Sequence, residues 1–493
     1  MSEPDALGPH SLCYSSECGK VLSVLYAGLV DMDSDGELIY RIAESVESED
    51  QVTWTIKLKE DWTFHNGDPV NADAYIRAWN WAAYAPNAAD TNGFFSVIEG
   101  YDAMNPTEPG VKPTATELSG LKKVDDHTFT VTLNAPFSQF DRSLLYTNAF
   151  GAQTQWCLDN TDACNEKPIG TGPYKMVSWE HDQSVVVERW ADYPGENAGK
   201  ADQITFSIYA DTGTAFRDWQ AGNLDVLNEP KPENVEQARQ LAGDRAVEEV
   251  ESSFYYIGIP QYLDTWTPKQ VHALALAINR EAIVENLLAG LAEPAASVVP
   301  PSIPGGGGDK CEFCTYDPER AKQLMAEAGG LPTKTITLWV NSGAGNEEWV
   351  KAIGNGWRET FGLDYTMETP QFSDYLDTMQ AHELTGPFRA GWSMDYPSMV
   401  NFLKPLYFSG FPSNHTTYSN EQFEQLVEEG NAADGEDAAI EKYTEAERLL
   451  LETMPVIPVY FGKAFYVYSD NVESVPYSAL HEVPEYESVV VSG

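Results

Sequence analysis

The stretch with the clearest chemical character begins at Arg389 and has the sequence Arg-Ala-Gly-Trp-Ser-Met-Asp-Tyr-Pro. It brings two opposite charges, Arg389 and Asp395, close to the rings of Trp392 and Tyr396, and it continues to 401–407, Asn-Phe-Leu-Lys-Pro-Leu-Tyr. A charge among aromatic side chains is costly to remove from water unless a partner compensates it. Either the chain or a ligand must supply that partner. The alternative role for Asp395 is to cap the turn that follows a strand, which is a common use of Asp.

The composition predicts several folded domains with a strong negative charge. A chain of 493 residues is longer than one hydrophobic core usually organises, so two or three domains are expected. Hydrophobic residues make up 42% of the chain and aromatic residues 12%, which excludes a disordered protein. The net charge of −46, from 76 acidic and 30 basic side chains, argues against a nucleic-acid partner. The same charge favours a soluble monomer.

No segment of the sequence predicts insertion into a membrane. A membrane-spanning helix needs about 18 consecutive apolar residues, and no such run occurs. The first residues, Met1-Ser-Glu-Pro-Asp, lack the basic and apolar pattern of an export signal. We interpret them as the start of a mature chain from which such a signal has been removed.

The six cysteines fall into three close pairs, and this favours disulfides and an extracytoplasmic location. The spacing alone does not fix their connectivity. Zinc is the rival interpretation for the Cys-x-x-Cys motif, but no second Cys pair or His pair lies near it, and the eight His are scattered. We therefore predict no metal site and no cofactor. The disulfide candidates are Cys13 with Cys18, Cys157 with Cys164, and Cys311 with Cys314.

The first part of the chain predicts an apolar helix or strand over 21–30 and an acidic turn over 31–36. This turn, Asp-Met-Asp-Ser-Asp-Gly, resembles the opening of an EF-hand calcium loop. Ile42 stands where such a loop requires Glu, so a hairpin turn is the better interpretation. Two later stretches, 52–59 and 124–133, have the alternation of apolar and polar residues that indicates half-buried strands, and strands are also predicted over 175–179 and 184–189.

Helices are predicted from their caps and their apolar faces. Asn71 is suited to cap a helix that buries Trp79. Thr267 begins a capping box, and its helix is expected to end near Gly290. Asp317 starts another helix. Three further elements are expected: a helix that buries Trp349, Ile353 and Trp357, two acidic helices over 421–453, and an apolar strand over 456–461.

Four separated segments carry a resemblance to a known protein family. They are 41–73 (with Arg-Ile-Ala-Glu-Ser-Val, Phe-His-Asn-Gly and Asn-Ala-Asp), 168–193 (with Pro-Ile-Gly-Thr-Gly-Pro-Tyr-Lys and Glu-Arg-Trp-Ala-Asp-Tyr), 271–322 (with Ala-Ile-Asn-Arg-Glu-Ala-Ile and Tyr-Asp-Pro-Glu-Arg-Ala-Lys), and the opening stretch together with 455–460 (Pro-Val-Ile-Pro-Val-Tyr). In this order and spacing they resemble the family 5 extracytoplasmic solute-binding proteins of ABC importers, the oligopeptide- and dipeptide-binding proteins. The likeness covers nearly the whole chain.

The resemblance implies an α/β fold with two lobes and three domains, the periplasmic-binding-protein type II, cluster C architecture. Domain I would comprise 1–46, 167–250 and 464–493, and domain II would be an α+β insert over 47–166. Domain III, the second lobe, would comprise 251–463. Two crossing strands would form a hinge, and the lobes would close around a ligand as in periplasmic binding proteins in general.

The resemblance also implies roles for the stretch at Arg389, which matches the family's Arg-Ala-Gly-Trp-x-x-Asp signature. Asp395 would accept the α-amino group of a peptide, and the backbone beside it would bind the peptide main chain as an added strand. Arg389 would either neutralise a peptide C-terminus or be structural. The candidate ligand-binding residues are Arg389, Gly391, Trp392 (a pocket wall), Ser393, Met394, Asp395 and Tyr396, with Phe94 and Phe95 as aromatic contacts and Ala27 in the early apolar segment.

The family likeness predicts a non-enzymatic receptor that captures oligopeptides and delivers them to ABC permease subunits. It would be extracellular at the cell surface, anchored through a lipid on an N-terminal Cys of the precursor, or periplasmic. Ala27 departs from the pattern, because many peptide binders have Glu before the Gly of this segment; ligand length and charge preference therefore do not carry over. The same fold could bind an oligosaccharide or another solute. A secreted hydrolase is less favoured, since neither Gly-x-Ser-x-Gly nor His-Glu-x-x-His occurs.

Overall fold

The computed structural model describes residues 1–4, 6–8, 16–33, 36–106, 108, 110–196, 198–308, 311–342 and 345–492. The chain divides into two compact units: unit 1 is Met1–Ala246 with Tyr466–Gly493, and unit 2 is Val247–Phe465. Unit 1 is thus built from two separated parts of the sequence, whereas unit 2 is continuous. The finer division of unit 1 into a core and an inserted domain stays a prediction.

Unit 1 begins with a helix that packs on a three-stranded antiparallel sheet. The elements are α1 (Ser16–Leu25), β7 (Tyr174–Glu180), β8 (Ser184–Arg189) and β9 (Gln203–Ser207). Buried side chains of α1, among them Val21 and Leu25, form a core with Tyr174 and Val185. After α1 the chain makes an antiparallel hairpin, which confirms the predicted turn. Its strands are β1 (Val30–Met32) and β2 (Leu38–Tyr40).

The glycines of the Pro-Ile-Gly-Thr-Gly-Pro motif allow two segments to touch. A Cβ at Gly170 would lie 1.9 Å from the carbonyl oxygen of Leu25, and one at Gly172 would lie 2.6 Å from the Leu25 carbonyl carbon. The N–H groups of Thr171 and Gly172 both donate to this carbonyl, at 3.1 and 2.8 Å. The motif therefore binds the end of α1 closely, which no larger residue at these two positions would permit.

A four-stranded antiparallel sheet with the order β3-β4-β6-β5 forms the next part of unit 1. Its strands are β3 (Ala43–Glu47), β4 (Thr53–Leu58), β5 (Leu121–Asp125) and β6 (Thr128–Thr132). The single strand predicted over 124–133 is wrong, because a turn divides it. The carboxylate of Asp125 accepts the N–H of His127 at 2.9 Å and holds that turn. Local turn formation thus overrides the alternating pattern.

Helix α2 (Ala72–Ala83) begins as predicted, since the side chain of Asn71 accepts the N–H of Ala74 at 3.1 Å. Trp79 on this helix is fully buried. The remaining helices of unit 1 are short: α3 (Tyr101–Met104), α4 (Phe140–Ser143), α5 (Thr147–Phe150), α6 (Gln155–Asp159), α7 (Thr161–Glu166), α8 (Thr212–Gln220) and α9 (Pro232–Ala242), with the 3-10 turns η1 (Ala85–Asn87), η2 (Asn92–Val97) and η3 (Gly243–Arg245).

The C-terminal segment of unit 1 adds small strand pairs. Strand β10 (Val226–Asn228) pairs antiparallel with Tyr466–Tyr468, the last residues of β16 (Val456–Tyr468). The pairs β17–β20 and β18–β19 follow. Their bounds, with the intervening 3-10 turn, are β17 (Val472–Ser474), β18 (Tyr477–Ser478), β19 (Val483–Pro484), η5 (Tyr486–Ser488) and β20 (Val490–Val491).

Unit 2 is organised around a mixed sheet in which the strands follow the order β16-β11-β15-β13-β14, and β12 also pairs with β16. The strands are β11 (Ala246–Gly258), β12 (Ala292–Pro294), β13 (Thr335–Trp339), β14 (Asp364–Glu368) and β15 (Phe388–Trp392). Strand β15 is antiparallel to β11, whereas β13 is parallel to both β14 and β15.

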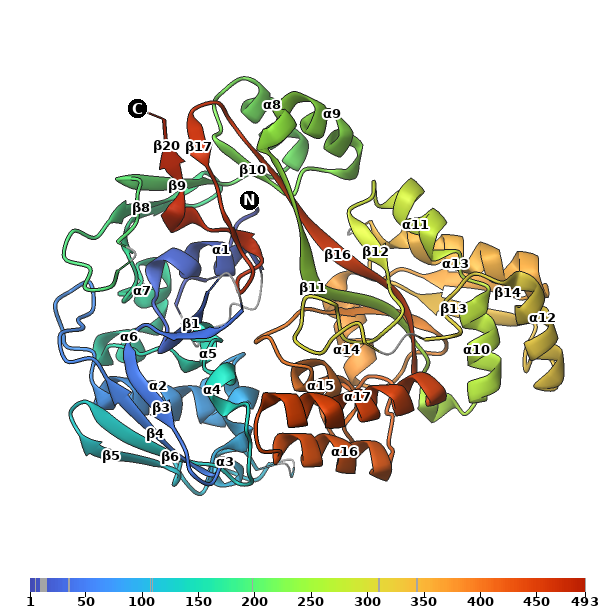
Figure 1. Ribbon diagram of the computed structural model, residues 1–493, viewed down its shortest axis with the longest axis horizontal. Coiled ribbons are helices and arrows are strands. Elements are labelled where there is room, and N and C mark those ends of the chain that lie inside the picture. Colours follow the sequence, from blue (N-terminus) through green and yellow to red (C-terminus); the bar gives the residue numbers. More distant parts are fainter. Residues whose placement is uncertain are drawn as a thin grey trace. The chain divides into compact units, whose positions relative to one another are not determined.

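Helices cover this sheet, and Figure 1 shows α10 beside α12 and α16 beside α17. The helices of unit 2 are α10 (Pro268–Leu276), α11 (Arg280–Leu287), α12 (Pro318–Glu327), α13 (Asn346–Phe361), α14 (Phe372–Gln380), α15 (Val400–Tyr407), α16 (Glu421–Asn431) and α17 (Glu436–Thr453), with the 3-10 turn η4 (Gln261–Leu263). The Thr267 capping box and the Asp317 cap are confirmed. On α13, Trp349, Ile353 and Trp357 are all buried, as predicted.

The helix expected from Thr267 to Gly290 is wrong in one respect, because it is broken into α10 and α11. Asn279 caps the second helix by accepting the N–H of Ala282 at 3.0 Å. Arg280 then turns inward and is 3% exposed. The break exists because this side chain is used inside the unit rather than at its surface.

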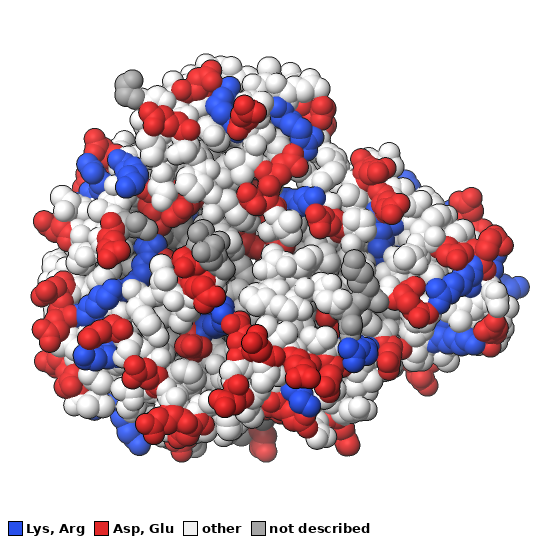
Figure 2. Space-filling view, viewed as in Figure 1, with Lys and Arg blue, Asp and Glu red and all other residues white. Residues whose placement is uncertain are grey.

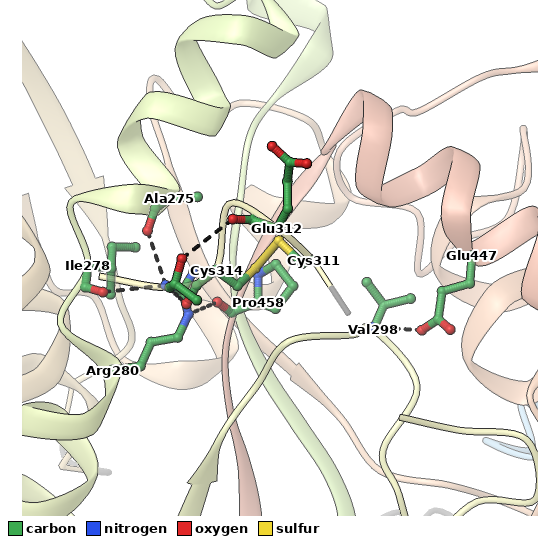
Figure 3. Close-up of a disulfide and its surroundings, with 10 residues drawn as sticks. Ala275, Ile278, Arg280, Val298, Cys311, Glu312, Cys314, Glu447 and Pro458 are labelled. Atoms are coloured by element: carbon green, nitrogen blue, oxygen red, sulfur yellow. Dashed lines mark hydrogen bonds between the residues drawn. A yellow bond between two sulfur atoms is a disulfide. The ribbon is translucent and has the colours of Figure 1, made fainter. Parts of the chain in front are cut away.

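The guanidinium of Arg280 is surrounded by main-chain carbonyls instead of carboxylates (Figure 3). Its Nε donates to Pro458 at 2.8 Å, and its Nη1 donates to Cys314 at 2.9 Å, to Ala275 at 3.1 Å and to Ile278 at 3.4 Å. Burial lowers the pKa of Arg280 to about 9, so the group stays protonated at neutral pH. One side chain thus joins the end of α10, strand β16 and the loop that contains Cys314.

Two of the predicted disulfides are confirmed, Cys157–Cys164 and Cys311–Cys314. Cys13 lies outside the described residues. Among the described helices, none combines the length and the hydropathy that a bilayer crossing requires. Figure 2 shows acidic side chains spread over the visible face of the molecule, with basic side chains between them.

Candidate functional site

The predicted binding stretch forms the end of strand β15, and one edge of this end is open. Strand β15 pairs with β11 from Phe388 to Trp392, but β13 reaches it only through Trp339 opposite Phe388. On the β13 side, Tyr375 Oη donates to the carbonyl of Arg389 at 2.6 Å. Alternate residues of a strand direct their main-chain groups to the same side. Gly391 therefore presents its N–H and C=O towards an edge where no strand of the described chain lies.

Asp395 follows this edge and carries the only carboxyl group of the stretch. It is half-buried, and its Oδ2 accepts a hydrogen bond from Asn401 Nδ2 at 2.9 Å. No described Lys or Arg forms an ion pair with it. Burial raises the pKa of Asp395 to about 7, and the bond from Asn401 acts in the opposite direction. A carboxylate in this state gains most from a ligand that brings a positive charge.

Arg389 is a second half-buried charge, and no described Asp or Glu forms an ion pair with it. Its Nη1 donates to Asn341 Oδ1 at 3.4 Å, and its guanidinium lies 5.2 Å from the ring centre of Tyr255. Its Nε is buried and has no hydrogen-bond partner in the described chain. This cation is held by an amide and an aromatic face, so it retains donors for a carboxylate.

The other residues of the stretch have different surroundings. Trp392 is half-buried, and its Nε1 has no partner among the described residues. Ser393 is exposed. The N–H of Met394 donates to Ser252 Oγ at 2.9 Å, so it is already satisfied. Burial, with the neighbouring Asp395 carboxyl, raises the pKa of Tyr396.

Phe94 and Phe95, in unit 1, differ in what they expose. Phe95 is fully buried, and its ring lies 5.3 Å from that of Phe150 and 6.1 Å from that of Trp79. Phe94 is half-buried, with its ring 4.6 Å from that of Tyr146. Phe94 is therefore the member of the pair that has surface to offer. The ligand contacts expected of both stay predictions.

Ala27, also in unit 1, is 4% exposed and is held by Thr171. Its N–H donates to Thr171 Oγ1 at 3.0 Å, and its carbonyl accepts from the same hydroxyl at 3.1 Å. Ala27 lines a small cavity together with Asp31, Arg41 and Glu487. Arg41 forms ion pairs with the carboxylates of both Asp31 and Glu487. Neither carboxylate therefore simply substitutes for the Glu that the family pattern has at the position of Ala27.

Sequence patterns did not identify four residues that complete the site. Asn401 was noted only as the start of a segment, although a polar residue in the first turn of an apolar helix is a signal. Ser252 and Tyr255 lie far from the stretch in sequence, Tyr375 lies 14 residues before Arg389, and none of the three carries a local signal. In the described part of the chain, no three His, Cys, Asp or Glu side chains gather closely enough to hold a metal ion.

Comparison with known proteins gives a consistent result. A sequence model of the bacterial extracellular solute-binding proteins, family 5 Middle, matches residues 37–414. The chain belongs to this family. This family 5 protein is 26% identical over 495 residues to the oligopeptide-binding protein OppA of Bacillus subtilis. The match covers 96% of this chain and 88% of OppA.

Solved structures share the fold of this family 5 protein. The Escherichia coli murein tripeptide binding protein MppA has a TM-score of 0.82 and 20% identity, covering 99% of this chain and 97% of MppA. The PBP AgaA from A. tumefaciens R10, in complex with agropinic acid, has a TM-score of 0.81 and 19% identity, covering 100% of this chain and 97% of AgaA. The predicted family and the α/β solute-binding-protein fold are confirmed. These relatives are named as binding proteins.

Proposed function

We propose that this protein captures peptides outside the cytoplasm and presents them to the permease of an ABC importer. One observation carries the proposal: the half-buried Asp395 carboxylate lies at the end of an open strand edge and has no cation beside it in the described chain. A peptide satisfies both features. Its N-terminal ammonium pairs with Asp395, and its main chain adds to the edge at Gly391 as a strand. Such main-chain bonds give affinity whatever the side chains are.

Arg389 and Trp392 extend this assignment. The Arg389 guanidinium has no carboxylate partner in the described chain, so the C-terminus of a short peptide is a suitable counter-charge. The half-buried Trp392 forms a wall for a peptide side chain. The proposal includes a monomer that is either extracellular, held at the cell surface by an N-terminal lipid, or periplasmic.

The named relatives support a solute carrier and leave a second candidate ligand. OppA is named for oligopeptides and MppA for murein tripeptide, whereas AgaA was solved with agropinic acid. The same fold thus holds a ligand that is not described as a peptide. A non-peptide solute that carries an amine would also suit Asp395.

Native mass spectrometry of the purified protein, followed by sequencing of the released ligand, tests the proposal. A series of short peptides is expected, and a single non-peptide mass would replace peptides by the second candidate. If nothing is released, titration with synthetic peptides decides. Asp395→Asn keeps the shape but removes the charge, and it is expected to weaken the binding of free-amine peptides. Unchanged affinity in this variant would show that Asp395 is not the anchor.

A further inference from the structure

Asn401 lies where it controls the atoms that Asp395 offers to a ligand. It belongs to the first turn of α15 and is 2% exposed. Its Nδ2 donates to Asp395 Oδ2 at 2.9 Å, and its Oδ1 accepts the N–H of Asp395 at 2.9 Å. A main-chain N–H can only donate and a carboxylate can only accept, so the partners fix the orientation of this amide.

This reciprocal pair leaves one carboxylate oxygen for a ligand. Oδ2 of Asp395 is held by Asn401, whereas no described residue donates to Oδ1. Because the main chain and the side chain of Asp395 are both bound to the same amide, the carboxylate cannot rotate without breaking a buried hydrogen bond.

Two main-chain donors next to the Asp395 carboxylate are satisfied within the protein. The N–H of Asp395 is taken by Asn401, and the preceding N–H, that of Met394, is taken by Ser252 at 2.9 Å. Ser252 is 1% exposed, so it is a fixed partner. Two consecutive N–H groups that could otherwise attract an anion or a carbonyl are thus removed. Neither of these two N–H groups is therefore left to compete with a ligand beside the carboxylate.

We propose that Asn401 is a positioning residue for ligand recognition, which makes Asp395 an acceptor-only site that takes a primary ammonium through Oδ1. This rests on the proposed function, in which Asp395 anchors the ligand. The amide does two things. It presents Oδ1 in one orientation, and its N–H stabilises the ionised carboxylate, the form that binds a cation. A secondary amide, such as an acetylated N-terminus, lacks the charge and two of the three donors.

The test compares tri-alanine with N-acetyl-tri-alanine by calorimetric titration between pH 5.5 and 8.5. Asn401→Leu is expected to lose on the order of tenfold in affinity for tri-alanine, the value of one hydrogen bond to a charged group. Its affinity for the acetylated peptide should stay unchanged, and the pH midpoint of tri-alanine binding should move upward. Asn401→Asp, which keeps the volume but replaces the donor by an acceptor, should behave alike and serves if the leucine variant fails to fold.

Asn431→Leu is the matched control. Asn431 is also a buried asparagine of unit 2, 4% exposed, and accepts a hydrogen bond from Tyr443 Oη at 2.8 Å. Its loss should lower stability without changing the preference for the free amine or the pH midpoint. A purely structural role for Asn401 would give this same result.

The outcomes separate the two proposals. The positioning role of Asn401 is wrong if its variants keep the parent's preference for tri-alanine over the acetylated peptide and the parent's pH midpoint of binding. It is also wrong if they lose affinity for both peptides equally. If Asp395→Asn then removes the preference for the free amine, Asp395 is still the anchor, without a positioning role for Asn401. If Asp395→Asn keeps the preference, the anchor is wrong, and the positioning role fails with it. A parent that binds neither peptide overturns both.

Discussion

Replacing Arg280 by lysine is expected to destabilise unit 2 more than any other conservative exchange of a basic residue in it. The guanidinium donates from two nitrogen atoms to four carbonyls, and these belong to three separate segments of the chain. A lysine ammonium keeps the charge but donates from a single point on an unbranched stem. It can therefore not bind Pro458 and Cys314 in the same geometry.

The size of the effect follows from the bonds that are lost. Ile278 also accepts the N–H of Arg280, and Ala275 accepts that of Ile278, so these two carbonyls keep a partner. The bonds to Pro458 and Cys314 are the net loss. Hydrogen bonds to charged groups contribute about 1.5–3 kcal/mol each, which gives about 3–6 kcal/mol for Arg280→Lys. A lysine ammonium is more strongly hydrated than a guanidinium, so burying its charge costs at least as much and does not offset this loss.

Urea unfolding, with hydrogen exchange of the peptides around 311–318 as a local reading, measures the effect. Arg358→Lys is the control, because Arg358 is exposed and pairs with Asp364 at the surface at 3.0 Å. That exchange should change the free energy of unfolding by no more than about 1 kcal/mol. Equal effects of the two substitutions would refute the reasoning, because the carbonyl bonds of Arg280 would then add nothing to stability.

Three further predictions follow from buried groups. His65 accepts the N–H of Gly170 at Nδ1, and burial lowers the pKa of His65 from 6.5 to about 4. Between these values the unfolded chain binds a proton that the folded chain does not, so the free energy of unfolding should fall by up to about 3 kcal/mol as pH decreases through this range. Thermal unfolding of His65→Gln should lack this loss. Peptide affinity should weaken about tenfold per pH unit below the Asp395 pKa of about 7, because a proton competes with the ligand. The stability of the unliganded protein should change in the opposite direction, decreasing between about pH 4 and 7 as pH rises, because the folded protein holds the proton that the unfolded chain releases. Calorimetry with and without peptide checks both. Replacing Cys311 and Cys314 together by serine should lower stability by about 2 kcal/mol, the loop-closure value for so short a separation, and urea unfolding of the variant beside the oxidised parent measures this loss.

Much of the fold could be predicted because local signals and packing agree. The capping box at Thr267 and the buried face with Trp349 and Trp357 are properties of single helices, and tertiary structure retains them. Where a prediction was wrong, a short polar signal was stronger than a longer apolar period. Asp125 makes a turn within an alternating stretch, and Asn279 starts a new helix within an apolar one.

The candidate site could be predicted only in part, because its chemistry depends on residues that are distant in sequence. Asp395 was identified through the family signature, but the sequence left open whether the chain or a ligand supplies its partner. The bond from Met394 to Ser252 joins positions separated by 142 residues, and no pattern near either of them indicates it. Tyr375, whose hydroxyl donates to the Arg389 carbonyl, is only 14 residues away, but no pattern near it indicates this bond either. Such contacts follow from sheet order rather than from local sequence.

The discontinuity of unit 1 has a consequence for the order in which the chain can mature. Strand β10 pairs with Tyr466–Tyr468, and all of unit 2 is encoded between these partners. During synthesis or export from the N-terminus, unit 2 has its complete sequence before unit 1 receives its last strands. Unit 2 can therefore fold first, while β10 in the part of unit 1 that was synthesised earlier is still unpaired. A truncation within Tyr466–Gly493 would then destabilise unit 1, although most of unit 1 is synthesised before unit 2.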